Sequence, residues 1–420
     1  ESDLGVTVSV ADLFEDRSIA RLAVQILEQL TGNTKAAVIE PVSRSRHLPL
    51  SFAQERLWFF DQLEPGNPFY NLCGAVRVTG QLNAEALRQS IEKIIARHEV
   101  LRTAFAGGEK EQIQVIFDAK SFPLPLIDLS DRSPEEREKA AQKMSAEEAQ
   151  LPFDLTQPHL LRAKLLRLSE MEHTLLLSAH HIIFDGWSLG VFLREIAAFY
   201  EGLSNKNLAA IPPLPIQYAD FATWQRQQMQ GEILETQLTY WKQQLSGSTA
   251  VLNLPTDFSR PAVQSYKGDR QLFELPEQLT EAIRQLSHRE KTTVFMTLLA
   301  AFKTLLYRYT GQEDILVGSP IANRNSSETE SLIGFFVNTL VLRTDLNGNP
   351  TFRELLSRVR EVALGAYAHQ DVPFEKLVEE LQPNRDLSHS PLFQVMFAFQ
   401  NASEFALELP GLSLNCQQIH

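Results

Sequence analysis

The sequence predicts a mixed α/β protein with two lobes. Amphipathic segments with a helical period alternate along the chain with short apolar runs that are typical of buried strands. The length of 420 residues is more than a single hydrophobic core usually supports, so two lobes are expected. A content of 44% hydrophobic and 22% charged residues is ordinary for a globular protein.

Each element follows from its own pattern. Apolar residues recurring at helical spacing predict helices, and continuous apolar runs bounded by polar or glycine residues predict strands. The predicted helices are residues 83–97, 134–150, 189–200, 221–245 and 293–309, and the predicted strands are 161–168, 174–178, 315–318 and 339–343. The proline-rich segment 211–215 breaks regular structure and is expected to mark the passage from the first half of the chain to the second.

The N-terminal region is predicted to be separate from these lobes. Asp16 and Ser18 are candidate caps of an amphipathic helix within residues 1–30, which as a unit is too short to bury a core. Residues 31–47 are polar without periodicity, which is typical of an interdomain linker.

Candidate catalytic residues lie where an apolar run, residues 175–177, leads into His180 and His181 and then Asp185 and Gly186. Side chains alternate along a strand, so the two imidazoles are expected to point to opposite faces. One can then exchange protons near neutral pH in a cleft while the other packs. Asp185 is expected to organise the turn, and Gly186 to permit a backbone conformation that other residues resist. The simpler alternative is that both histidines are structural, with their ring nitrogens in hydrogen bonds within the fold.

Two other chemistries share this segment. Residues 186–190 form a G-x-S-x-G pattern, which in hydrolases follows an apolar strand and precedes an Asp and then a His. Here an acid precedes the first glycine, and Ser188 is better placed as a helix N-cap. A metal site is disfavoured because adjacent strand histidines diverge and no third ligand has a suitable spacing.

Composition limits the partners and the compartment. A formal net charge of −13 argues against a nucleic-acid-binding surface. No apolar run approaches the length of a membrane span, and the first residues do not form a signal peptide. Cys73 and Cys416 provide no disulfide framework. A cytoplasmic protein that binds neither membrane nor nucleic acid is expected.

Seven segments in order resemble one family. Residues 180–186, HHIIFDG, resemble the HHxxxDG motif of the condensation domains of nonribosomal peptide synthetases. The other motifs of that family resemble residues 51–58, 97–105, 218–225, 333–339, 369–375 and 385–394. The resemblance thus extends from Ser51 to Gln394.

The resemblance implies a domain organisation. Two chloramphenicol acetyltransferase-like lobes are expected to form a V-shaped pseudo-dimer, with the histidine motif at their junction. Residues 1–30 resemble the C-terminal part of a peptidyl carrier domain, and residues 31–47 would be the linker. The N-lobe is expected over 48–215 and the C-lobe over 216–420, with the family's last strands and helices missing.

The resemblance also implies a reaction. An upstream carrier presents an aminoacyl or peptidyl thioester on its phosphopantetheine arm, and a downstream carrier presents an α-amine that attacks it. The domain itself is expected to bind no cofactor. Its partners would be the two carriers and a neighbouring adenylation domain. The donor is expected to end in an L-residue, because no epimerisation domain lies between residues 1–30 and the condensation domain.

Roles for single residues follow by position in the motifs. His181 would be the base or the group that positions the amine, and His180 would be structural. Asp185 is expected to pair with Arg102 of the second motif. Asn338 would donate a hydrogen bond into the cleft or cap a turn.

Two relatives of condensation domains remain alternatives. An epimerisation domain shares the histidine motif, but its flanking motifs differ, and the segments 51–58 and 369–375 favour condensation. A recruitment domain without catalytic activity would typically have lost the histidines that are present here.

Overall fold

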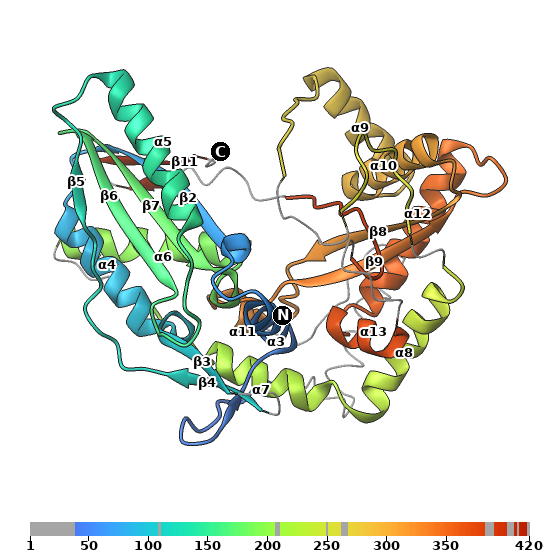
Figure 1. Ribbon diagram of the computed structural model, residues 1–420, viewed down its shortest axis with the longest axis horizontal. Coiled ribbons are helices and arrows are strands. Elements are labelled where there is room, and N and C mark those ends of the chain that lie inside the picture. Colours follow the sequence, from blue (N-terminus) through green and yellow to red (C-terminus); the bar gives the residue numbers. More distant parts are fainter. Residues whose placement is uncertain are drawn as a thin grey trace, which may run out of the picture. The chain divides into compact units, whose positions relative to one another are not determined.

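The computed structural model describes residues 38–107, 111–205, 211–248, 251–261, 268–382, 390–400, 407–409 and 411–417. It has the mixed helices and sheets that the sequence predicts (Figure 1). The carrier-like residues 1–30 and most of the predicted linker lie outside the described residues.

The chain forms two compact units that are not contiguous in sequence. We call the first the N-unit, which comprises Ile39–Gln227, Arg324–Phe336 and Asn401–His420. We call the second the C-unit, and its described residues lie within Gln228–Asn323 and Val337–Gln400, together with Val38. A simple division between residues 215 and 216 therefore does not describe the packing. The segment after residue 215 packs with the N-unit, where the Tyr218 hydroxyl bonds Ser51 Oγ at 2.8 Å and Gln217 bonds the backbone of Glu99 and Arg97.

The N-unit is built on a six-stranded sheet. Its strands, in spatial order, are β10 (Leu407–Leu409), β11 (Leu412–Gln417), β2 (Asn71–Gly80), β7 (Glu172–His180), β6 (Leu161–Ser169) and β5 (Leu126–Asp128). The pairs are antiparallel except β5 with β6. The register of β2 with β7 sets Asn71 opposite His180, so the histidine lies at the end of a central strand.

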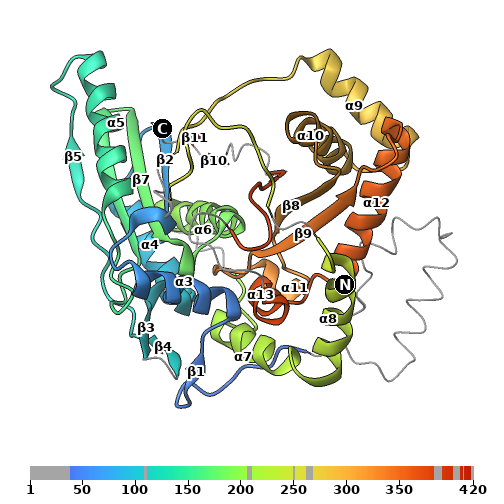
Figure 2. The same cartoon turned by 45° about the vertical axis from the view of Figure 1, so that its right-hand side comes forward.

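Helices cover both faces of this sheet. On one face α5 (Pro134–Gln150) packs through Ala141 against Leu166 and Leu176, while α4 (Ala84–Arg97) and α6 (Gly186–Asn205) pack together on the other face (Figure 2). The unit also contains α3 (Phe52–Leu63), α7 (Tyr218–Gln228), α11 (Ser327–Glu330) and a small sheet of β1 (Leu48–Pro49), β4 (Gln112–Ile116) and β3 (Thr103–Gly107).

The C-unit has one antiparallel strand pair in its described part, β8 (Asp314–Ile321) with β9 (Asn338–Asp345). Helices α10 (Val294–Thr310) and α12 (Phe352–Ala368) pack against these strands. The remaining helices are α8 (Gly231–Leu245), α9 (Glu277–Arg289) and α13 (Phe374–Leu381). Buried side chains from α8, α10, α12 and both strands form one hydrophobic core.

Most predicted elements are confirmed, and the differences have local causes. The predicted helix 221–245 is two helices, because the helix is interrupted before Gly231, which has a φ of 57°. The predicted helix 189–200 begins earlier, at Gly186. In the described part of the chain, no helix is long and apolar enough to cross a membrane.

Candidate active site

The histidine motif occupies a strand-to-helix connection in the N-unit. Strand β7 ends at His180, and His181 already begins a 3₁₀ helix, η3 (His181–Ile183). The prediction that both histidines lie on the strand is therefore wrong. The chain leaves the strand because His180 Nδ1 accepts a hydrogen bond from the Ile182 N–H at 3.2 Å and so caps η3. The two imidazoles nevertheless have different surroundings.

His180 is enclosed by other residues. Its side chain is 4% exposed, and the rings of Tyr70 and Phe153 lie edge-on to it at centroid distances of 6.4 and 6.2 Å. Burial, with a smaller contribution from His181, lowers the pKa of His180 to about 3. A neutral, buried imidazole that caps η3 fits the structural role expected for this residue.

The buried neutral state of His180 predicts a pH dependence of stability. The folded-state pKa is about 3 and the unfolded value is about 6.5, so the stabilisation is present above pH 6.5 and is lost as the pH falls toward 3. The loss is about 1.4 kcal/mol per pH unit within this window. We expect His180→Asn to reduce the slope of the unfolding free energy against pH between 6.5 and 5, measured by urea denaturation. An unchanged slope would show that His180 is not the group responsible.

His181 is partly exposed and has a defined tautomer. Its Nδ1 lies 2.8 Å from the carbonyl oxygen of Phe184, and a carbonyl only accepts, so Nδ1 carries the proton. The other nitrogen, Nε2, then carries the lone pair. Burial lowers the pKa of His181, although the Phe184 bond and the charge of Asp185 oppose this and Arg56 adds to it. The imidazole is therefore neutral near pH 7 and able to accept a proton.

Asp185 organises the turn, as predicted. It is 1% exposed, and its carboxylate accepts from Ser188 N at 2.8 Å, which caps α6, and from Phe336 N at 3.1 Å. It thereby connects the histidine motif to the segment Arg324–Phe336, which we call the bridging loop. Gly186 does not have the special conformation we expected, because its φ is not positive and an added Cβ would contact nothing within 4 Å.

The prediction that Asp185 pairs with Arg102 is wrong, because the partner is Arg324. The Arg324 guanidinium donates to the Asp185 carboxylate at 3.1 Å, and both side chains are 1% exposed. The same guanidinium lies 4.0 Å from the centroid of the Phe336 ring. The sequence offered no local pattern for this pair, since the residues are 139 positions apart.

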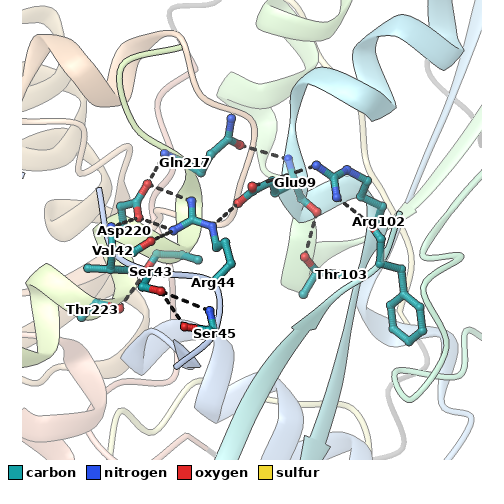
Figure 3. Close-up of polar contacts among 12 residues, drawn as sticks. Val42, Ser43, Arg44, Ser45, Glu99, Arg102, Thr103, Gln217, Asp220 and Thr223 are labelled. Atoms are coloured by element: carbon teal, nitrogen blue, oxygen red, sulfur yellow. Dashed lines mark hydrogen bonds and ion pairs between the residues drawn. The ribbon is translucent and has the colours of Figure 1, made fainter. Parts of the chain in front are cut away.

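Arg102 has other contacts. Its guanidinium donates to the carbonyl of Phe117. It also lies 4.0 Å from Glu99, beside which it is drawn in Figure 3. Glu99 also accepts a hydrogen bond from Arg44 at 2.8 Å. Arg102 is therefore bonded to the residue that follows β4, and among the described residues it forms no hydrogen bond or ion pair with the histidine motif.

Ser188 is a structural residue. Its side chain is 0% exposed, and its hydroxyl bonds the Asp185 carboxylate at 2.7 Å and accepts from Gly334 N at 3.0 Å. This geometry does not support a hydrolase nucleophile. The N-cap of α6 is Asp185, so the prediction of Ser188 as the cap is also wrong. No group of three or more described His, Cys, Asp or Glu side chains is arranged to hold a metal ion.

Asn338 has a structural role in the C-unit. Its amide nitrogen donates to the carbonyls of Gln370 and Val372, both at 2.8 Å, and its oxygen accepts from Phe374 N at 3.0 Å. These bonds anchor the connection between α12 and α13 to β9. Both amide protons have carbonyl acceptors, so the geometry favours the structural alternative over donation into a cleft.

The end of the predicted linker is anchored to the N-unit. Asp220, 1% exposed, accepts two hydrogen bonds from the Arg44 guanidinium, at 2.6 and 3.0 Å, and one from Val42 N at 2.7 Å (Figure 3). We call this set of contacts the Arg44 clasp. Residues Val42–Arg44 are therefore part of the folded unit, and the prediction of a linker as far as residue 47 is wrong for them.

The clasp predicts a coupled effect on stability. We expect Arg44→Ala and Asp220→Ala each to destabilise the protein, with a coupling energy of about 1–3 kcal/mol in a double-mutant cycle, because the bonds are charge-assisted and one partner is buried. Each variant should also increase proteolysis within residues 38–47. Arg46→Ala is the matched control, since Arg46 is exposed in the same segment. Additive effects of the two substitutions would contradict the clasp.

Comparisons with known proteins agree with the motifs. The family described as "Condensation domain" matches residues 44–420. One of the linear gramicidin synthase proteins of Brevibacillus parabrevis is 51% identical over 413 residues, which are 98% of this chain and 5% of that protein. Malpinin synthetase of Mortierella alpina is 44% identical over 98% of this chain and 5% of its own length. The chain thus spans only a small part of these relatives.

Solved structures agree with the fold. The X-domain from teicoplanin biosynthesis superimposes with a TM-score of 0.82 at 30% identity, covering 91% of this chain and 84% of that chain. The first condensation domain of the CDA synthetase has a TM-score of 0.74 at 21% identity, covering 89% of this chain and 87% of its own. The predicted chloramphenicol acetyltransferase-like fold class is confirmed by these neighbours.

Proposed function

Because this chain belongs to the condensation-domain family of nonribosomal peptide synthetases, we propose that it joins two carrier-bound substrates through a peptide bond. An upstream carrier supplies an aminoacyl or peptidyl thioester, and a downstream carrier supplies a free α-amine. The amine nitrogen attacks the thioester carbonyl carbon to give a tetrahedral intermediate. The C–S bond then breaks, and the donor arm leaves as its thiol.

His181 is the catalytic residue in this proposal. The observation that carries it is the tautomer, since Nδ1 donates to Phe184 O and leaves the Nε2 lone pair on a partly exposed ring. Nε2 takes a proton from the attacking amine and returns it to the departing sulfur. Such proton transfer contributes roughly 10²–10⁴-fold to a rate. Holding the amine and the thioester together supplies further acceleration.

The neighbouring residues act by position. His180 fixes the end of β7 and the start of η3, and Asp185 with Arg324 holds the bridging loop beside the motif. Gly186 begins α6, and Arg102 and Asn338 stabilise other parts of the fold.

The substrates bring their own prosthetic group. We infer that phosphopantetheine arms of the two carriers present both substrates and that the domain binds no cofactor of its own. A neighbouring adenylation domain would load the carriers. From the sequence resemblance alone, residues 1–30 derive from the upstream carrier.

The function is tested with the full chain and two separate, loaded carrier domains. Formation of the dipeptidyl thioester on the acceptor carrier, detected by mass spectrometry, is the expected result. Exchange of the donor α-proton with deuterated water and no dipeptide would indicate an epimerisation domain instead. Absence of both activities with intact carriers would contradict an enzymatic role and favour recruitment of another protein.

We expect the donor to carry an L-configured terminal residue. With the carrier-like residues 1–30 preceding the condensation domain directly, an epimerising step has no place between them. A racemic donor thioester should give mainly the L-containing dipeptide, as measured by chiral chromatography of the hydrolysed product. An L-only donor and a D-only donor serve as matched controls, and preferential use of the D-donor would overturn the assignment.

A further inference from the structure

An aromatic ring from a distant part of the chain lies against the imidazole of His181. The ring belongs to Phe335 in the bridging loop, and its centroid is 4.6 Å from that of the imidazole at an interplanar angle of 55°. Phe335 itself is 3% exposed. This contact lies within the N-unit, although 154 positions separate the two residues (335 − 181).

The backbone that carries this ring is held at three successive residues. Gly334 N–H donates to Ser188 Oγ at 3.0 Å, and the next carbonyl, that of residue 335, accepts from the Tyr218 hydroxyl. Phe336 N–H then donates to Asp185 at 3.1 Å. Two of these three partners, Asp185 and Ser188, follow His181 closely in the chain, so the Phe335 ring and the imidazole are tied to the same short segment.

Packing limits the loop further. A Cβ added to Gly334 would lie 2.1 Å from Cδ2 of Tyr218, so the close approach of the loop to this ring requires glycine. The Tyr218 ring also meets the Phe336 ring edge-on at a centroid distance of 4.9 Å. The residues on both sides of Phe335 are therefore held in place by Tyr218.

The Phe335 ring and the Nδ1 hydrogen bond limit the orientation of the His181 imidazole in different ways. The imidazole is attached to the backbone through Cβ, and among its polar contacts the bond from Nδ1 to Phe184 O sets the rotation of the ring about the Cβ–Cγ bond. The Phe335 ring, whose centroid lies 4.6 Å from that of the imidazole, opposes a change in that rotation sterically. The direction of the Nε2 lone pair is then determined by two independent contacts.

We propose that Phe335 is a positioning residue that fixes the orientation of the His181 imidazole. This inference rests on the proposed function, because it assigns the orientation a purpose in proton transfer. It also gives Asp185 a way to act on His181 without touching it, through the backbone of the bridging loop.

The effect of the Phe335 ring on the pKa of His181 can be separated from the effects of nearby charges. The charges that act on His181 come from Asp185, which raises its pKa, and Arg56, which lowers it, while His180 is the adjacent titratable ring. Substitution of Phe335 leaves all three in place. Water admitted beside the imidazole then raises the pKa of His181 toward its ordinary value, since burial is the main cause of the lowering.

The test compares Phe335→Leu, which removes the ring, with Phe335→Tyr, which retains it. We expect Leu to lower kcat about 10–100-fold with a much smaller change in KM, and to move the acidic limb of the pH–rate profile to higher pH. Tyr should restore most of kcat. The matched control is Phe105→Leu, which removes a buried phenylalanine of the small sheet and should leave kcat and the profile unchanged at equal folding.

A second measurement does not depend on activity. In full-length protein labelled with ¹⁵N-histidine, NMR titration gives the pKa and tautomer of His181 directly, assigned by comparison with His181→Asn. Phe335→Leu should raise this pKa. Wild-type kcat, profile and His181 pKa in a folded Phe335→Leu variant would overturn the proposal, whereas failure of the wild type to form dipeptide contradicts the proposed function alone.

Discussion

His181→Ala is expected to lower the rate of dipeptide formation by about 10²–10⁴-fold without unfolding the protein. The imidazole is partly exposed, and its Nδ1 hydrogen bond is to a backbone carbonyl, so removing the ring costs little stability. His181→Asn is a sharper variant, because its amide can donate to Phe184 O but cannot accept a proton. Both variants should be measured with loaded carriers by mass spectrometry, together with their thermal melting.

The matched control is His159→Ala, which removes an exposed histidine from the same unit. It should leave the rate unchanged. The direction of the pKa shift adds a second criterion, since burial lowers the pKa of His181 below its ordinary value of about 6.5. The acidic limb that wild-type protein shows, and that His181 variants lack, should therefore lie below that pH. Wild-type rates in His181→Asn would refute its role as a proton acceptor.

Arg324→Ala is expected to destabilise the protein by about 3–5 kcal/mol, because it leaves the Asp185 carboxylate buried without its charged partner. The bridging loop should loosen at the same time, since Arg324 also donates to the carbonyl of Leu332. Asp185→Ala should have a comparable effect, with strong coupling in the double mutant. Unfolding free energies from urea denaturation provide the measurement.

Arg102→Ala is the control for this pair. Arg102 has no contact with Asp185, so the same cycle with Arg102 in place of Arg324 should be additive. Asp185→Asn keeps the size and one acceptor of the side chain, and is the variant to use if alanine prevents folding. Additivity of Arg324 and Asp185 would mean that the ion pair contributes nothing measurable.

Local patterns were sufficient to predict α4, α5, α6 and α10, whereas α3, α9, α12 and α13 were not predicted. The helix 134–150 was predicted with its observed bounds because its start is determined by adjacent residues, with Ser133 and Glu136 forming a capping box. Thr293 caps α10 through its side chain in a similar way. The histidine motif was also recognisable in the sequence, since its residues lie within seven positions.

Long-range partners could not be predicted in this way. Choosing between Arg102 and Arg324 for Asp185 requires the path of the chain in space, and both arginines have the same charge. Phe335 was missed because nothing in an apolar segment shows which ring will face an imidazole. No periodic pattern in the sequence indicates that the bridging loop returns to the N-unit.

The Arg44 clasp has a consequence for the recombination of synthetase modules. A chimera joined at residue 47, where sequence alone places the boundary, would attach a foreign segment to a unit that retains Asp220. Unless that segment supplies a guanidinium at the same place, a carboxylate 1% exposed loses both hydrogen bonds from its cation. A junction upstream of residue 38 transfers the arginine and the aspartate together.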